Sequence, residues 1–264
     1  MKIQFASDLH LEMQGNSRWI KHNPLEVTGD VLVLAGDIIY LGNENLLRHP
    51  FWKWASENYK QVLVVPGNHE FYDGFDIGQL HDGWTLEILP NVRYYYNSVV
   101  WIENVEFILS TLWAEIKLKN AFACEQGIND FFRIIANGKR LDYTRFNEEH
   151  KKCVDFISKV CSSPLPDGYR RIIVSHHLPS FQLMDQQYKD SPLNGAFVSE
   201  QSDVVDASGA DYWIFGHSHS NTSTQIGRCK CVSNQRGYVA YGEGLSFDVG
   251  MTITCDGIST SSRR

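Results

Sequence analysis

The segment Gln61-Val62-Leu63-Val64-Val65-Pro66-Gly67-Asn68-His69-Glu70 joins a short apolar run to a polar turn. Residues 61–65 are rich in Val and Leu and are short enough to form a buried strand. The turn that follows carries an amide, an imidazole and a carboxylate. Because ligands bind just beyond the carboxyl ends of the strands in open α/β sheets, this segment predicts a strand with site residues at its end.

Four more apolar runs end in the same way, at Lys2–Ala6, Val31–Ala35, Arg171–Ser175 and Tyr212–Phe215. The side chains that follow them can bind metals or move protons: Asp8 and His10, Asp37, His176 and His177, and His217 and His219. Apolar residues at helical spacing lie between the runs at 43–58 and 144–161, and more weakly at 199–207. This alternation predicts an α/β sheet with parallel strand pairs, in which all five polar groups converge on one place.

Two further groups of short runs predict antiparallel strands. Residues 92–96, 99–102 and 105–109 are joined by Asn-Ser and Glu-Asn turns, and the runs at 222–226, 229–233 and 249–254 are similar. We therefore expect a second, more antiparallel sheet beside the first. Neither a repeat nor a linker is visible, so we expect one domain over residues 1–258 and a frayed Ser-rich tail at 259–264.

The composition is that of an ordinary globular protein. Of the 264 residues, 43% are hydrophobic and 21% are charged, which excludes disordered and collagen-like chains. The net charge of −7 argues against a uniformly basic nucleic-acid-binding surface. No apolar stretch approaches the ~20 residues that span a bilayer, and the first residues lack the pattern of a signal peptide. We therefore expect a cytoplasmic protein without a membrane partner.

The polar motifs, taken in order, resemble those of the calcineurin-like metallophosphoesterases. They are Asp8-Leu9-His10, Gly36-Asp37, Gly67-Asn68-His69-Glu70, His176-His177 and Gly216-His217-Ser218-His219. The resemblance spans residues 3 to about 220, and residues 234–238 are similar to a loop of small prokaryotic members. It implies an α/β fold, the four-layer α-β-β-α sandwich of two mixed sheets. One position departs from the family pattern, because Tyr40 stands where the family has a second Asp.

The resemblance also implies two divalent metal ions and their ligands. One metal would take Asp8, His10 and His219; the other would take Asn68, His177 and His217; and Asp37 would bridge them. The family's ligand histidine stands two residues before a proline, which selects His177 and leaves His176 as a neighbour facing the substrate. Imidazole and hard oxygen donors together suit transition metals better than Mg or Ca, and we expect Mn ahead of Fe, Zn or Ni.

The function implied is phosphoester hydrolysis by a metal-activated hydroxide, with a phosphodiester as the expected substrate. His69 would be the general acid, and its alternative is a structural histidine in a tight turn. Glu70 could orient His69 or be solvated. A nuclease acting on DNA or RNA with the same centre is the alternative function. A non-catalytic metal-binding scaffold is a lesser one, because His69 and every ligand are present.

Few residues point to the substrate, which could be a small molecule or a nucleic acid. The segment 112–143 is a candidate pocket-shaping insertion, and its aromatic residues could stack on a base or pack together. Residues 133–152 hold six basic residues against three acids, which predicts a solvated helix face or a phosphate-attracting rim. By analogy with the family loop, Arg236 and Tyr238 are candidate substrate contacts, as is His176. Nothing in the sequence predicts the oligomeric state.

Overall fold

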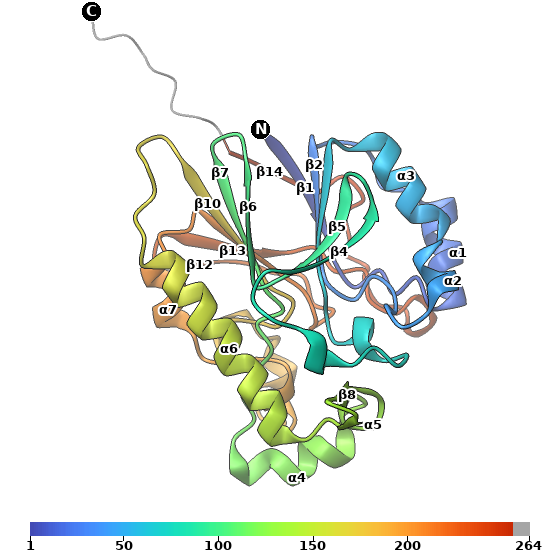
Figure 1. Cartoon of the computed structure of the whole chain (residues 1–264), viewed down its shortest axis with the longest axis vertical. Coiled ribbons are helices and arrows are strands. Elements are labelled where there is room, and N and C mark those ends of the chain that lie inside the picture. Colours follow the sequence, from blue (N-terminus) through green and yellow to red (C-terminus); the bar gives the residue numbers. More distant parts are fainter. Residues whose placement is uncertain (256–264) are drawn as a thin grey trace, which may run out of the picture.

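Two mixed six-stranded sheets form the centre of the computed structural model, which describes residues 1–255 (Figure 1). The first sheet has the order β14 (Thr252–Thr254), β1 (Lys2–Ala6), β2 (Val31–Ala35), β3 (Gln61–Val65), β5 (Val92–Tyr96) and β4 (Trp84–Leu89). The second has the order β12 (Ser223–Ile226), β13 (Cys229–Ser233), β11 (Tyr212–Phe215), β10 (Arg170–Val174), β7 (Val105–Leu109) and β6 (Ser98–Ile102). The expected tail at 259–264 lies outside the described residues.

The two sheets have the same plan of strand directions. In each, the inner strand pairs are parallel and the pair at each edge is antiparallel. The prediction of a more antiparallel second sheet is therefore wrong, because β10 and β11 lie in the second sheet with β7 and β13. The runs at 92–96 and 99–102 do not form one meander either. The chain crosses from the first sheet to the second at Asn97, whose φ is 42°.

The space between the sheets is filled by alternate residues of facing strands. Ile3 and Phe5 of β1 and Val31 and Val33 of β2 pack in one cluster with residues of β7, β10 and β11. Successive side chains of a strand point to opposite faces, so the residues in between face outward toward the helices. Because both faces of each sheet are buried, the inner strands are apolar throughout and do not alternate between apolar and polar residues.

Helices cover the two outer faces and complete four layers (Figure 1). The outer face of the first sheet is covered by α1 (Gln14–His22), α2 (Glu44–Leu47) and α3 (Pro50–Asn58). The second sheet is covered by α6 (Tyr143–Cys161) and α7 (Ser202–Ala207). The helix expected over 43–58 is interrupted, because Pro50 disfavours helical backbone at His49 and starts α3 at its own first position.

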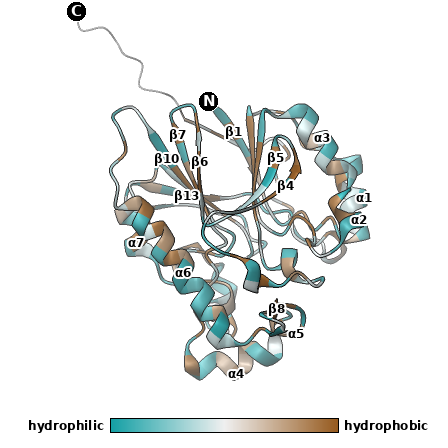
Figure 2. Ribbon diagram, viewed as in Figure 1, coloured by the Kyte–Doolittle hydropathy of each residue, from teal (hydrophilic) through white to brown (hydrophobic). Residues whose placement is uncertain are grey.

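The segment 112–143 forms a small subdomain below the sheets in Figure 1. It contains α4 (Leu118–Gly127), α5 (Asp130–Arg133) and the hairpin of β8 (Ile135–Ala136) and β9 (Lys139–Arg140). Trp113 and Phe131 are buried in the core, whereas Phe122 and Phe132 are exposed. Figure 2 shows teal and brown residues together on the helices, as expected for helices that cover a sheet with one face.

Short 3-10 turns complete the described chain, at η1 (His69–Phe71), η2 (Ile77–Gln79), η3 (Phe181–Leu183), η4 (Gln186–Tyr188), η5 (Asn194–Ala196) and η6 (Val239–Tyr241). Within residues 1–255, no helix has the length and apolar character needed to cross a membrane.

Candidate metal centre

The residues that follow five strands of the two sheets lie close together, as the sequence predicts. Three groups of possible metal ligands have donor atoms within 4.8 Å of one another: Asp8, His10 and His219; His10, Asp37 and His69; and Asp37, His176 and His217. The residues come from the ends of β1, β2, β3, β10 and β11. The carboxyl ends of the parallel strands therefore meet across the two sheets and form one polar cluster.

The backbone of this cluster is strained in a way that the motifs alone do not reveal. Five site residues lie in the left-handed region, with φ of 55° at Asp8, 46° at His10, 56° at Asp37, 75° at His217 and 51° at His219. Such conformations are unfavourable for residues with a side chain and collect at functional sites. They turn the side chains inward directly after each strand.

Glycine is required where two of these turns touch a carboxylate. A Cβ at Gly67 would lie 2.2 Å from Oδ1 of Asp37, and a Cβ at Gly216 would lie 2.7 Å from Oδ2 of Asp8. Both distances are shorter than any side chain allows, so only glycine permits this close approach.

The first group of donors presents two imidazole nitrogens to one point. Nδ1 of His10 lies 3.2 Å from a carboxylate oxygen of Glu12, and Nδ1 of His219 lies 2.6 Å from one of Glu243. The two Nε2 atoms face each other at 3.1 Å, and Nε2 of His219 is 3.3 Å from Oδ1 of Asp8. Because the carboxylates hold the outer N–H groups, the inner nitrogens keep free lone pairs, which fits a bound cation.

In the second group, Nδ1 of His176 makes an outer hydrogen bond and Nε2 of His176 faces the other donor atoms. Its Nδ1 donates to the carbonyl of Ala35 at 2.9 Å. Its Nε2 lies 3.1 Å from Oδ1 of Asn68, 3.1 Å from Nδ1 of His217 and 3.3 Å from Oδ1 of Asp37. The other oxygen of Asp37 is 3.8 Å from Nε2 of His10, so this carboxylate presents one oxygen to each group. The donor set therefore fits two transition-metal ions that share Asp37.

The structure places His176, and not His177, among the clustered donor atoms. His177 is fully buried with its ring against Trp113 and Phe146, at centroid distances of 5.4 and 6.0 Å. Its Nδ1 lies 3.4 Å from the carbonyl of Thr111, and its Nε2 has no hydrogen-bond partner within residues 1–255. The histidine that follows β10 directly points into the cluster, and the next one points into the core. The prediction of His177 as a ligand is corrected to His176, which is buried and does not line the cavity as a substrate contact.

His69 lies at the boundary between the cluster and the cavity. Its Nδ1 is 3.1 Å from the same Glu12 oxygen that holds His10, and its Nε2 is 3.0 Å from the hydroxyl of Tyr238. Its backbone N–H donates to Oδ1 of Asp37 at 2.9 Å. Burial alone would lower the pKa of His69, but the carboxylates of Asp37 and Glu12 raise it above its ordinary value. The ring can therefore carry a proton toward the cavity.

Glu70 fills neither of its expected roles. It is fully buried, and its carboxylate accepts backbone N–H groups of Gly67, Asp37 and Ile38 at 2.7–2.9 Å. Burial and the nearby Asp37 raise its pKa to about 7. Glu70 thus ties the loop after β2 to the loop after β3.

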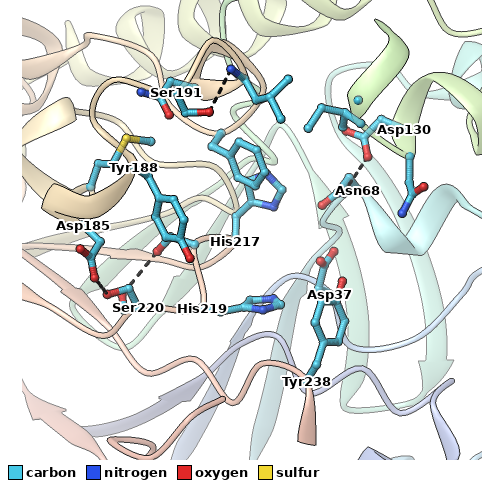
Figure 3. Close-up of a pocket in the computed structure, with 18 of the residues that line it drawn as sticks. Asp37, Asn68, Asp130, Asp185, Tyr188, Ser191, His217, His219, Ser220 and Tyr238 are labelled. Carbon is cyan, nitrogen blue, oxygen red and sulfur yellow. Dashed lines mark hydrogen bonds between the residues drawn. The ribbon is translucent and has the colours of Figure 1, made fainter. Parts of the chain in front are cut away.

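A cavity of about 620 Å³ opens beside the cluster (Figure 3). One wall is residues 127–130 of the 112–143 segment, and the facing wall comes from residues 184–197, which the sequence did not single out. Tyr238 and Glu243 of the last loop also line it. Arg236 does not, because its guanidinium stacks on Trp19 at 4.2 Å and donates to the carbonyl of Glu243 at 2.5 Å. The prediction that Arg236 contacts substrate is therefore replaced by a role in holding this loop.

Three carboxylates that contact residues of the cluster were not predicted from the sequence: Glu12, Asp130 and Glu243. Glu12 stands two residues after His10, a spacing that could have drawn attention to it. Asp130 and Glu243 lie in segments without a recognisable pattern.

Tyr40, at the position that departs from the family pattern, lies beneath Arg133, whose guanidinium is 5.4 Å from the centre of the Tyr40 ring. Three of the six basic residues of 133–152 lie on α6, where Arg145 and Lys152 pair with the buried Glu149 and Lys151 pairs with the exposed Asp155.

Comparison with known proteins identifies a family and one relative by sequence. The profile of the calcineurin-like phosphoesterase family matches residues 1–221. The uncharacterised protein L509 of Acanthamoeba polyphaga mimivirus is 26% identical over 262 residues, which cover 89% of this chain and 91% of that protein.

Solved structures are similar to the chain at low sequence identity. The phosphopantetheinyl hydrolase PptH of Mycobacterium tuberculosis has a TM-score of 0.66 at 16% identity, over 90% of this chain and 89% of its own. A dimetal phosphatase of Danio rerio has a TM-score of 0.47 at 14% identity, over 88% and 86% of the two chains. The first of these likenesses shows the same arrangement of two sheets and their helices.

Proposed function

Because the chain belongs to the calcineurin-like phosphoesterase family and is a metallophosphoesterase, we propose that it hydrolyses a small-molecule phosphodiester at a centre of two divalent transition-metal ions. The observation that carries the proposal is the position of Asp37. Its two oxygens face two separate groups of donors, one at 3.8 Å from Nε2 of His10 and one at 3.3 Å from Nε2 of His176.

The proposed ligands divide between the two ions. Asp8, His10 and His219 would hold one; Asn68, His176 and His217 would hold the other; and Asp37 would serve both. When bound, two such ions orient the phosphoryl oxygens and lower the pKa of a bound water, so that a nucleophile exists near neutral pH. Only two of the seven ligands are carboxylates, so the loaded site keeps a positive charge that attracts a phosphate. Manganese is the ion we propose, with Fe, Zn or Ni as alternatives.

His69 supplies the proton that the leaving group needs. Glu12 holds the Nδ1 proton, so the proton that can be transferred sits on Nε2, beside the hydroxyl of Tyr238 at 3.0 Å. An alkoxide leaves slowly unless it is protonated, and a positioned acid contributes ~10²–10⁴-fold to such a step. Tyr238 lines the cavity and steadies the ring that carries this proton.

The size of the cavity supports a small substrate that carries organic groups esterified to the phosphate. Its volume of about 620 Å³ lies within the range of ligand pockets and far exceeds one phosphoryl group. Ile128, Tyr188 and Phe197 give it apolar and aromatic walls against which an organic substituent can pack. A nuclease with the same centre is the alternative that the experiment below separates.

The test is a turnover screen on metal-stripped protein reloaded with Mn²⁺. The substrates are p-nitrophenyl phosphate, bis-p-nitrophenyl phosphate, cyclic nucleotides and single-stranded DNA. We expect metal-dependent hydrolysis that is faster on the small diesters than on the monoester or DNA, and that Asp37→Ala abolishes. Protein that binds two metals and hydrolyses none of these substrates would contradict the proposal, and preference for DNA would select the nuclease.

A further inference from the structure

The single helical turn α5 places a buried carboxylate behind Asn68. Asp130 is fully buried, and its Oδ1 lies 2.8 Å from Nδ2 of Asn68 and 2.5 Å from the hydroxyl of Tyr72. That hydroxyl lies 3.0 Å from the same Nδ2. Figure 3 shows the Asn68–Asp130 bond at the edge of the cavity. The three side chains therefore form one closed hydrogen-bonded group.

This group holds the nitrogen end of the Asn68 amide. A side-chain amide has two N–H donors on one end and a carbonyl acceptor on the other. Asp130 and the hydroxyl of Tyr72 both accept from Nδ2, so the carbonyl Oδ1 faces the opposite way, 3.1 Å from Nε2 of His176. A flipped amide would put its oxygen against the Asp130 carboxylate and its N–H groups toward the metal centre. The hydrogen bonds thus select the orientation in which Asn68 can be a ligand.

The turn that carries Asp130 is anchored on both sides. Phe131 packs in the core against Phe146, with ring centroids 5.9 Å apart. Arg133 stacks over the ring of Tyr72 at 5.0 Å, as it does over Tyr40. The packing of Phe131 and Arg133 therefore fixes the position of the Asp130 carboxylate.

We propose that Asp130 is a positioning residue that orients the Asn68 amide for metal binding, so that the 112–143 segment helps to build the metal centre as well as the cavity wall. This inference rests on the proposed function, since it presumes that Asn68 binds a metal. Asp130 itself does not touch the metal or the substrate; it acts through Asn68.

The test is calorimetric titration of metal-stripped protein with Mn²⁺, which resolves the two binding events without measuring activity. In Asp130→Leu, which has similar size but no acceptor, we expect one event to weaken ~10–100-fold, as is usual when a partner of a metal ligand is lost, and the other to be unchanged. Asp130→Asn should retain near wild-type affinity, because its carbonyl can still accept the Asn68 proton. The matched control is Asp155→Leu on the exposed face of α6, which should bind both ions normally.

Thermal melting checks that each variant folds. If Asp130→Leu does not fold, Tyr72→Phe replaces it, since it removes one partner of the amide and keeps the ring; a smaller loss at the same binding event supports the proposal. Wild-type affinities in the folded variant, or an equal loss in Asp155→Leu, would overturn this inference alone. Wild-type protein that binds no divalent metal would overturn the proposed function and this inference together.

Discussion

One oxygen of Glu12 holds both a proposed metal ligand and the proposed general acid, at 3.2 Å from Nδ1 of His10 and 3.1 Å from Nδ1 of His69. The carboxylate is almost completely buried, and the two rings it holds lie 4.5 Å apart between centroids. Both imidazoles therefore carry a proton on Nδ1, while Nε2 of His10 faces His219 and Nε2 of His69 faces the hydroxyl of Tyr238. The orientation of the ligand and that of the acid depend on the same side chain.

Replacing Glu12 should accordingly damage two properties at once. In Glu12→Gln the negative charge is lost and one amide oxygen must serve two imidazoles. We expect a ~10–100-fold loss in Mn²⁺ affinity at the Asp8–His10–His219 site, with a fall in turnover at saturating metal. The measurements are metal titration and kcat, with the exposed Glu26→Gln as the control. Unchanged affinity and turnover would show that Glu12 is dispensable.

Asp37→Ala should remove both ions, since the two oxygens of Asp37 face the two groups of donors. Elemental analysis of purified wild-type protein should find about two transition-metal ions per chain, and the variant should hold neither tightly. A variant that keeps one ion at wild-type affinity would show that Asp37 does not bridge.

The neighbouring histidines after β10 should behave differently. His176→Ala should lose the second ion, because its Nε2 lies among Asn68, His217 and Asp37. His177→Ala should keep both ions but lower the free energy of unfolding by about 0.5–3 kcal/mol, because it removes a ring packed in the core. Metal analysis and denaturant unfolding separate the two effects, and the opposite pattern would restore the assignment made from the sequence.

A buried ion pair away from the site should contribute to stability. Arg171 is buried and donates to Glu106 at 2.5 Å and to the carbonyls of Ser208 and Ser163 at 2.6 and 2.9 Å. Arg171→Met leaves the Glu106 charge buried without its partner, which should cost about 3–5 kcal/mol.

The adjacent Arg170 is the matched control, since its side chain is 36% exposed and pairs with Asp211 near the surface. Arg170→Met should cost only about 0–1 kcal/mol. Urea unfolding measures both variants, and equal losses would contradict the role assigned to burial.

The sequence predicted the strands and the cluster because both depend on local patterns. A buried strand is a short apolar run, and the residues after each run share one edge, so β1, β2, β3 and β11 begin and end where expected. Which sheet a strand joins depends on partners far along the chain, and β10 and β11 were therefore assigned to the wrong sheet. The strand β4 was missed because polar residues interrupt its apolar ones, and none of its residues is fully buried.

The details of the site were less predictable because they depend on side-chain direction. Nothing in the pair His176-His177 says which ring turns inward; the backbone after β10 decides it. Asp130 and Glu243 come to the site through tertiary packing of segments that carry no motif. Glu12 is the exception, because the motif at β1 places it close to His10.

The central claim is that His69 protonates the leaving group and that the binding of the two metal ions does not require His69. The direct test is kcat of wild type and His69→Ala on two diesters that differ only in the leaving group, p-nitrophenol or an alkyl alcohol, with metal content measured in parallel. We predict two bound ions in both proteins. In His69→Ala, kcat should fall ~10²–10⁴-fold on the alkyl ester. It should fall far less on the p-nitrophenyl ester, because p-nitrophenolate leaves without protonation. Equal losses on the two esters, or a loss of metal in the variant, would contradict the account.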